Sequence, residues 1–252
     1  MKNREETYEI MDVCLLAGKI MLRSGAETYR VEDTMQRIAS ALGIEQSHSY
    51  VTPTAILFSA EDRKPETTRL ARISERTTDL KKVVLVNDVS RRISNGIIDL
   101  DEARRQLREI ETSQLMFSFW LQVLAAALAS GCFVIMFQGG WYDFLPAFIA
   151  GGAGYYSVIL FHRLIPVKFF AEFLGSVIIG VVSYLFIIFH LGVELDKIII
   201  GAVMPLVPGL LLTNAVRDLM AGHLVSGISK GAEAFLTAFA IGSGIAVVLS
   251  FL

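Results

Sequence analysis

Long stretches without any Asp, Glu, Lys or Arg occupy most of the second half of this chain. They cover residues 112–142, 144–162, 173–193, 198–216 and 234–252. Each is close to, or longer than, the ~20 residues that a helix needs to cross ~30 Å of hydrocarbon. These runs predict an all-α membrane domain of about five spanning helices, near 115–137, 142–161, 171–190, 198–216 and 233–252. The last run is short and the fourth contains prolines, so counts of four or six also fit the pattern.

The first half has the opposite composition. Of 48 charged residues, 37 lie in residues 1–114, and 18 of these are basic and 19 acidic. This contrast predicts a small soluble domain over 1–114, followed by the membrane domain over 115–252. The near balance of charge gives no basic surface for nucleic acid. Two cysteines cannot form a disulfide framework or a metal site by themselves, so no metal or cofactor is expected.

Helix signals come first in the soluble half. Apolar spacing predicts an amphipathic helix over 6–23. Ser24 and Glu27 have the spacing of a capping box, in which each side chain accepts a hydrogen bond from the other residue's backbone N–H. A second helix is therefore predicted to start at this pair and to end near Gly43.

The rest of this half mixes strands and helices. A strand is predicted over 46–60 with Pro53 at an edge or bulge, then a turn over 61–65 and a partner strand over 67–76. Asp79 and Asp99 are predicted to cap two more helices, which end near residues 94 and 112. The order of elements indicates an α+β domain.

The connections between the apolar runs suggest an orientation. For five spans, the basic residues Arg163, Lys168, Arg217 and Lys230 fall on the side that holds the soluble domain. By the positive-inside rule this side is the cytoplasm, and an odd number of spans places Leu252 outside. The N-terminus lacks an apolar signal segment. We therefore expect a multi-pass protein of the plasma (inner) membrane with a cytoplasmic N-terminus.

The fourth apolar run is interrupted by helix-breaking residues. Pro205 and Pro208 each remove a backbone donor, and Gly209 loosens the helix further. Backbone groups freed at membrane depth are tolerated only where they line protein or a watery cavity. Transporters place substrate at such breaks, with N–H groups aimed at a carboxylate. A simple proline kink is the alternative.

Polar residues follow this break by about one helical turn. Thr213, Asn214, Arg217 and Asp218 can share one helical face. Arg217 can hold a substrate carboxylate through two parallel N–H bonds, and Asp218 can neutralise Arg217 when no substrate is present. The alternative is a helix end at the cytoplasmic surface with snorkelling charges.

Two glutamates mark the starts of other spans. Glu172 and Glu233 can each exchange protons if they are partly removed from water, or they can be solvated residues at the membrane boundary. We assign Glu172 to the boundary and retain Glu233 as a translocation candidate.

Two common enzyme motifs are absent from the sequence. It contains no phosphate-binding GxxxxGK[ST] and no HExxH, so we do not expect an enzyme. The alternative functions are a membrane-anchored hydrolase that uses Glu27, His48 or Asp88, and a regulatory protein that acts through its soluble domain. A hydrolase would need an ordered set of nucleophile, base and orienting group, which the sequence does not indicate.

Four segments carry a resemblance to a known family. Ala17–Ala39, Val51-Thr-Pro-Thr, Val86-Asn-Asp-Val-Ser-Arg-Arg and the run from Leu206 to Leu219 together resemble the threonine/serine exporter family. The resemblance covers nearly the whole chain. Leu211 departs from it, because a second proline is expected there, and this leaves the shape of the break open.

The resemblance implies a proton-driven exporter of small amino acids (threonine or serine) or of small dicarboxylates such as succinate. It also implies a smaller membrane-embedded partner subunit, oligomerisation and contact with membrane lipid. The residues that it singles out for substrate binding or translocation are Pro208, Gly209, Thr213, Asn214, Arg217 and Asp218. In the segment Ala17–Ala39, which we call the first signature, it singles out Gly25, Glu27, Thr28, Tyr29 and Arg30, and we expect these residues to have a cytoplasmic gating role.

The first signature also contains a polar stripe that capping and packing do not explain. It consists of Glu27, Arg30, Thr34 and Arg37. We expect this stripe to be a docking or gating surface against the intracellular mouth of the pore, near Arg217 and Asp218.

Overall fold

The computed structural model describes residues 4–60, 67–164 and 167–251. They form two compact units. The first contains residues 1–116 together with 210–231, and the second contains 117–209 together with 232–252. Composition alone predicts a boundary near residue 114, but the contacts add the segment after the proline break to the first unit.

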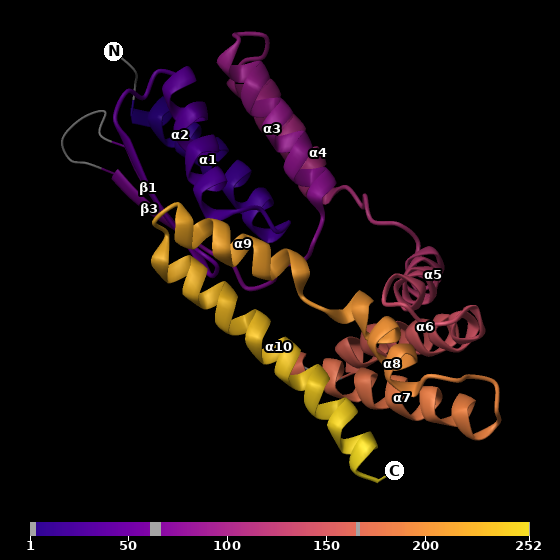
Figure 1. Ribbon diagram of the computed structural model, residues 1–252. Helices are drawn as coiled ribbons and strands as arrows, with labels where there is room; N and C mark the ends of the chain where they lie inside the picture. Colours follow the sequence, from indigo (N-terminus) through magenta and orange to yellow (C-terminus); the bar gives the residue numbers. More distant parts are fainter. Residues whose placement is uncertain (1–3, 61–66, 165–166, 252) are drawn as a thin grey trace. The chain divides into compact units, whose positions relative to one another are not determined.

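The first unit combines helices with a small sheet (Figure 1). Its strands form one antiparallel sheet in the order β1-β2-β3. The strands are β1 (Ser47–Thr52), β2 (Ala55–Ala60) and β3 (Thr67–Arg72). The helices before and after the sheet are α1 (Arg4–Arg23), α2 (Thr28–Ala41), α3 (Leu80–Ser94) and α4 (Leu100–Thr112). Two later helices also contribute, α9 (Gly209–Met220) and the first part of α10 (Leu224–Ser250).

The sheet corrects one prediction. The single strand predicted over 46–60 is a hairpin, because Pro53 and Thr54 form a two-residue turn between β1 and β2. Thr52 and Ala55 flank the turn, and the Ala55 N–H donates to Thr52 Oγ1 at 3.1 Å. Proline suits a turn because its φ is preset and it has no N–H to pair. The predicted turn over 61–65 lies outside the described residues, and the partner strand is confirmed from Thr67 to Arg72.

Two of the predicted helix caps are confirmed. Asp79 accepts a hydrogen bond from the Lys82 N–H, and Asp99 accepts one from the Glu102 N–H at 2.9 Å. Both caps are local, since donor and acceptor lie three residues apart. The α3–α4 pair therefore begins and ends where the sequence predicts.

The capping box of Ser24 and Glu27 is wrong. Gly25 has φ +90°, and its N–H and that of Ala26 bond to the Leu22 and Met21 carbonyls at 3.3 and 3.1 Å. This is a Schellman motif that ends α1, with glycine in the left-handed conformation that other residues avoid. Ser24 therefore belongs to the end of α1. Glu27 precedes α2 but makes no side-chain capping bond.

The core of the first unit lies between α1, α2, the sheet and the α3–α4 pair. Among its largest fully buried side chains are Ile10, Met35, Ile38, Phe58 and Leu107. Val31, Met35 and Ile38 form the buried face of α2, as the helical spacing predicts. This packing fixes the corner between α1 and α2, which carries the first signature.

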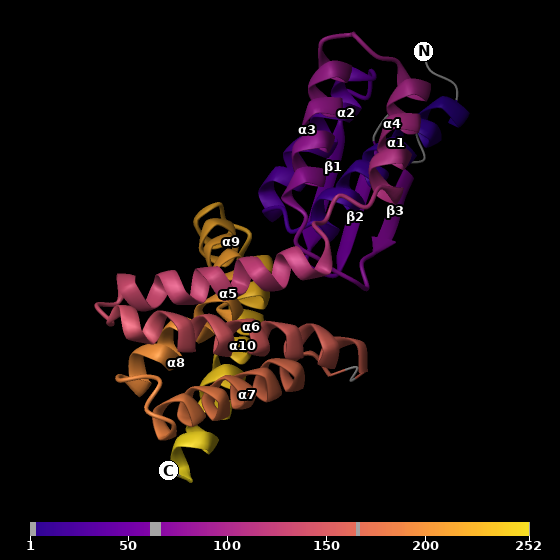
Figure 2. The same ribbon diagram turned by 90° about the vertical axis from the view of Figure 1, so that its right-hand side faces the viewer.

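The described residues of the second unit form helices and the connections between them (Figure 2). Its elements are α5 (Phe119–Met136), α6 (Trp141–Leu164), α7 (Lys168–Ile188), α8 (Leu195–Val203), the 3-10 turn η1 (Met204–Leu206) and the remainder of α10. α5, α6 and α7 lie side by side, and α8 packs against all three. Helices cross a membrane well because all their backbone groups are paired internally.

Four described helices are long and apolar enough to cross a membrane, namely α5, α6, α7 and α10. The predicted span over 198–216 is not one continuous helix. It is interrupted at Val207 and Pro208, between η1 and α9, and forms either a broken span or a re-entrant loop. The described residues therefore contain four candidate spans, or five if the interrupted pair counts as one span. α10 begins at Leu224, earlier than the predicted 233.

Candidate functional site

Polar groups, most of them buried, join the α1–α2 corner to α9 and the first turns of α10. All of them belong to the first unit. We call this set the polar cluster, and its members are Gly25, Glu27, Thr28, Asn214, Arg217, Asp218 and Lys230.

Asp218 is the centre of the polar cluster. Its carboxylate is fully buried and accepts two hydrogen bonds from Thr28, from the backbone N–H to Oδ1 and from the hydroxyl to Oδ2, both at 2.9 Å. Thr28 is the first residue of α2, where backbone N–H groups lack partners within the helix and the helix dipole favours an anion. Asp218 therefore supplies the N-terminal cap that Glu27 does not provide.

Lys230 balances the charge of Asp218. Its ammonium lies 2.7 Å from Asp218 Oδ2, 3.2 Å from Thr28 Oγ1 and 3.4 Å from the Ala26 carbonyl oxygen. An ammonium has three donors, and here each has an acceptor. Lys230 is only 4% exposed. This ion pair is therefore buried, and its members are hydrogen-bonded to the start of α2.

The sequence analysis missed the role of Lys230, which it counted only as a basic residue of a connection. A usable signal was the position of Lys230 four residues after Ser226, which places both on one helical face. Ser226 is also buried and donates to the Val51 carbonyl at 3.0 Å. Gly227, between them, lets α10 approach α9, because a Cβ there would lie 3.0 Å from the Ala215 carbonyl oxygen.

Arg217 occupies the edge of the polar cluster. Its guanidinium donates to Glu27 Oε1 at 2.6 Å, and Arg30 donates to Glu27 Oε2 at 3.3 Å. The Arg217 side chain is 61% exposed, whereas that of Glu27 is 8% exposed. Burial works to raise the pKa of Glu27, but a backbone hydrogen bond and the two arginines outweigh it and hold this pKa below its usual range. Asn214 completes the contact by donating to the Gly25 carbonyl at 2.9 Å.

This pairing corrects a prediction for Asp218. We expected Asp218 to neutralise Arg217. In the described residues Asp218 pairs with Lys230 and Arg217 pairs with Glu27. The reason is geometric, since Asp218 lies on the buried side of α9 and the Arg217 side chain is mostly exposed.

A second titratable pair lies beside the polar cluster. Glu32 Oε1 accepts the Val51 N–H at 2.9 Å and lies 3.7 Å from Nδ1 of His223, in the turn between α9 and α10. Burial raises the pKa of Glu32, and the charge of Asp218 adds to this, although the Val51 N–H and His223 oppose it. The sequence analysis did not single out this pair.

Other predicted site residues lie outside the polar cluster. Thr213 is exposed, and its hydroxyl donates back to the Leu210 carbonyl at 3.0 Å. Tyr29 is 38% exposed. Pro208 lies at the interruption and Gly209 begins α9, where a Cβ would meet no atom within 4 Å.

The two glutamates of the membrane spans differ from each other. Glu233 is half-buried and belongs to the second unit. Glu172 is only 6% exposed, so its assignment as a solvated boundary residue is wrong.

The predicted polar stripe reaches α9 through Glu27, with Arg30 bound to that glutamate. Thr34 is buried, and its hydroxyl lies 3.4 Å from Asn87 Oδ1 on α3. Arg37 forms an exposed ion pair with Asp33, one turn earlier on α2. The stripe is therefore not one continuous docking surface.

The residues suggested for hydrolysis are not brought together. Glu27 is bound by Arg217 and Arg30, while Asp88 is exposed on α3 with Arg92 as its ion partner. His48 is exposed on β1. The first unit therefore presents no set of nucleophile and base from these residues.

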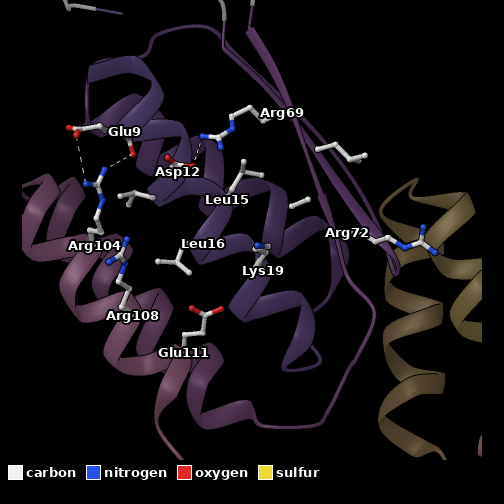
Figure 3. A pocket seen from close by; sticks show the side chains of 13 residues that line it. Glu9, Asp12, Leu15, Leu16, Lys19, Arg69, Arg72, Arg104, Arg108 and Glu111 are labelled. Atoms are coloured by element: carbon white, nitrogen blue, oxygen red, sulfur yellow. Dashed lines mark hydrogen bonds and ion pairs between the residues drawn. The ribbon is translucent and has the colours of Figure 1, made fainter. Parts of the chain in front are cut away.

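A separate cavity of about 630 Å³ lies between α1, β3 and α4 of the first unit (Figure 3). Arg69 and Arg104 on its walls pair with Asp12 and Glu9. Among the described residues Lys19, which also lines it, has no ion-pair partner. Unpaired positive charge in a concave surface attracts small anions. No motif in the sequence pointed to this cavity.

Comparison with known proteins identifies the family. The family model described as "Putative threonine/serine exporter" matches residues 12–252. The chain belongs to the threonine/serine exporter family. Together with the apolar helices of the structure, membership of this exporter family makes it a multi-pass membrane protein.

Relatives within the threonine/serine exporter family differ in length. The chain is 26% identical to the "Probable succinate transporter subunit YjjP" of Klebsiella aerogenes, over 98% of this chain and 96% of the relative. It is 23% identical to the "Threonine/serine exporter" of Corynebacterium glutamicum, over 97% of this chain but 52% of the relative. A "Probable threonine/serine exporter" of Mycobacterium tuberculosis is also 23% identical, over 92% of this chain and 44% of the relative. No solved structure matches the chain.

Proposed function

We propose that this chain is one subunit of a secondary, proton-coupled exporter in the plasma membrane. Its substrate is a small amino acid such as threonine or serine, or a small dicarboxylate such as succinate. The partner is a smaller membrane-embedded subunit. The name of a relative supports a partner, because the chain aligns with nearly all of a protein named as a transporter subunit.

One observation carries the proposal. After the interruption at Pro208, α9 and α10 present two cations, Arg217 and Lys230, and each is held by a carboxylate of the protein itself. A substrate carboxylate offers these cations the same kind of oxygen ligands that Glu27 and Asp218 offer them. Exchange of the internal carboxylate for that of the substrate keeps each cation paired, and for the buried Lys230 this avoids the cost of a buried unpaired charge.

This exchange also gives the first signature a role. If Asp218 moves to admit substrate, α2 loses its N-terminal cap and Thr28 loses both of its hydrogen bonds to that carboxylate. Occupation of the site and the position of α2 are then linked. The cytoplasmic corner acts as a gate, and Pro208 and Gly209 provide the point at which α9 can swing.

Flux measurements test the proposal. The chain is reconstituted in proteoliposomes with its smaller partner, and labelled threonine, serine and succinate are offered under a proton gradient. Movement of any of these against controls without protein supports the exporter. If none of them moves, the proposal fails. Hydrolysis of a metabolite by the full chain would favour the membrane-anchored enzyme instead.

A labelling experiment tests the topology. Single cysteines at positions 2 and 252 are probed with a membrane-impermeant reagent from each side. Five spans place them on opposite sides, with position 2 in the cytoplasm. If both react from the same side, the interrupted pair of α8 and α9 is a re-entrant loop and the count is four.

A further inference from the structure

A buried glutamate stands out in the second unit. Glu172, in the first turns of α7, has a side chain that is 8% exposed. Its Oε1 lies 3.3 Å from Nε2 of His162, in the last turn of α6. Its Oε2 is buried and has no hydrogen-bond partner among the described atoms. An ionisable residue within a membrane helix is costly to retain, which indicates a function.

The pair has two states that differ by one proton transfer. In one, a carboxylate faces an imidazolium. In the other, the proton has moved from Nε2 of His162 to Oε1 of Glu172, so that one N–H bond breaks, one O–H bond forms and both charges disappear. Desolvation penalises the charged state, while the Coulomb attraction of the pair favours it. An imidazole nitrogen and a carboxyl oxygen can each hold a proton, so the pair can bind and release one.

The two members have different access to their surroundings. The imidazole is 37% exposed, whereas the carboxyl is 8% exposed. His162 is therefore the more exposed member of the pair, and Glu172 is the internal member. The adjacent Arg163 places its guanidinium over the Phe119 ring, 5.8 Å from the centroid, and does not ion-pair with Glu172.

No other described side chain forms an ion pair with Glu172. Further charges on α7 and on the helices that pack against it are Lys168 on α7, Asp143 on α6, Asp196 and Lys197 on α8, and Lys230 and Glu233 on α10. Asp143 is bound at the other end of α6, where it accepts the Val193 N–H at 2.6 Å.

A row of buried hydroxyls continues from Glu172 along α7. Ser176 and Ser183 are fully buried, and at 100° per residue they lie about 40° and 20° from Glu172 around the helix. Ser183 Oγ has no hydrogen-bond partner among the described atoms. At 1.5 Å per residue, Ser183 is about 16 Å further along the axis. The face of α7 that carries Glu172 therefore also carries two buried hydroxyls, although the helix is otherwise mostly apolar.

We propose that His162 and Glu172 form a proton-binding site in the second unit, and that Ser176 and Ser183 extend its polar surface along α7. The use of this site to drive export rests on the proposed function. The binding of a proton does not.

Infrared spectroscopy of the full chain in lipid nanodiscs tests proton binding directly. On acidification, the wild type gains the C=O band of a protonated, weakly hydrogen-bonded carboxyl. Glu172→Gln lacks this band, and His162→Gln shifts the pH at which it appears. Glu194→Gln is the matched control, because Glu194 is 41% exposed in its ion pair with Lys197. An unchanged band in Glu172→Gln, or its absence from the wild type, overturns the site.

Flux then separates the site from the proposed function. In proteoliposomes with the partner subunit, Glu172→Gln loses transport driven by a pH gradient but retains exchange of labelled for unlabelled substrate. If gradient-driven flux is unchanged, the site does not drive export. If the wild type moves no substrate, the exporter proposal fails, and the infrared band alone decides the proton site.

Discussion

Thr28 donates both its backbone N–H and its hydroxyl to the carboxylate of Asp218, 190 residues later in the chain. The first residue of α2 is thus capped by a side chain of α9. Lys230, on α10, neutralises the same carboxylate. Three helices depend on one buried carboxylate, which allows specific predictions.

Asp218→Asn should strongly destabilise the protein. The amide can still accept from Thr28, but the Lys230 ammonium remains buried without a counter-charge, which costs about 3–5 kcal/mol. Thermal unfolding in detergent should show a clear fall in Tm. The double variant Asp218→Asn/Lys230→Met should recover most of it, because no buried charge remains. A double variant as unstable as the single one would show that the orphaned ammonium is not the cause.

Arg217→Ala should abolish export while leaving the protein folded. The side chain is 61% exposed, so loss of its ion pair with Glu27 should cost less than about 1 kcal/mol. The control is Arg37→Ala, which removes another exposed ion pair on α2 and should leave flux unchanged. Normal flux in Arg217→Ala would reduce this residue to a surface anchor.

Charge reversal at Glu27 tests the same contact from the other side. Glu27→Lys places a cation beside Arg217 and Arg30, and we expect loss of transport. Adding Arg217→Glu should restore part of the flux, because an opposite pair is re-formed. Intact transport in Glu27→Lys would leave the first signature with a purely structural role.

Two glutamates should give opposite pH dependences of stability. The pKa of Glu32 is raised, so the cost of its ionised form is present above its folded pKa and disappears below its unfolded value. The pKa of Glu27 is lowered, so its stabilisation is present above the unfolded value and is lost as pH falls through the folded pKa.

We therefore expect Glu32→Gln to raise Tm at neutral pH, and Glu27→Gln to lower it. Both differences should shrink as pH falls toward about 4, where glutamates become protonated. Thermal unfolding over this range provides the measurement. A pH-independent difference for either variant would mean that its effect comes from packing rather than from ionisation.

Gly25 and Gly209 should respond differently to alanine. Gly25 has φ +90°, so Gly25→Ala should cost about 1 kcal/mol or more, and Gly25→Asn less, since asparagine tolerates this conformation. A Cβ at Gly209 meets no atom within 4 Å, so Gly209→Ala should be neutral or stabilise by up to about 1 kcal/mol. Chemical unfolding compares the two, and equal costs would contradict the Schellman assignment.

Local signals in the sequence succeeded where the responsible atoms are close in the chain. The caps at Asp79 and Asp99 act on an N–H three residues later, and they were predicted correctly. The capping box at Ser24 has the same spacing but failed, because Gly25 ends α1 first. Where one segment of sequence fits two local motifs, the packing around that segment decides which of the two motifs forms.

The sequence by itself determined the membrane character, the charge-rich first half and the break at Pro208, since each depends on residues that are contiguous in the chain. Only the tertiary structure decided that Asp218 binds Thr28 and Lys230 rather than Arg217, and that Glu172 is buried beside His162. A buried charge pairs with whichever oppositely charged group the fold brings next to it. Partners on other helices leave no periodic signal in the sequence.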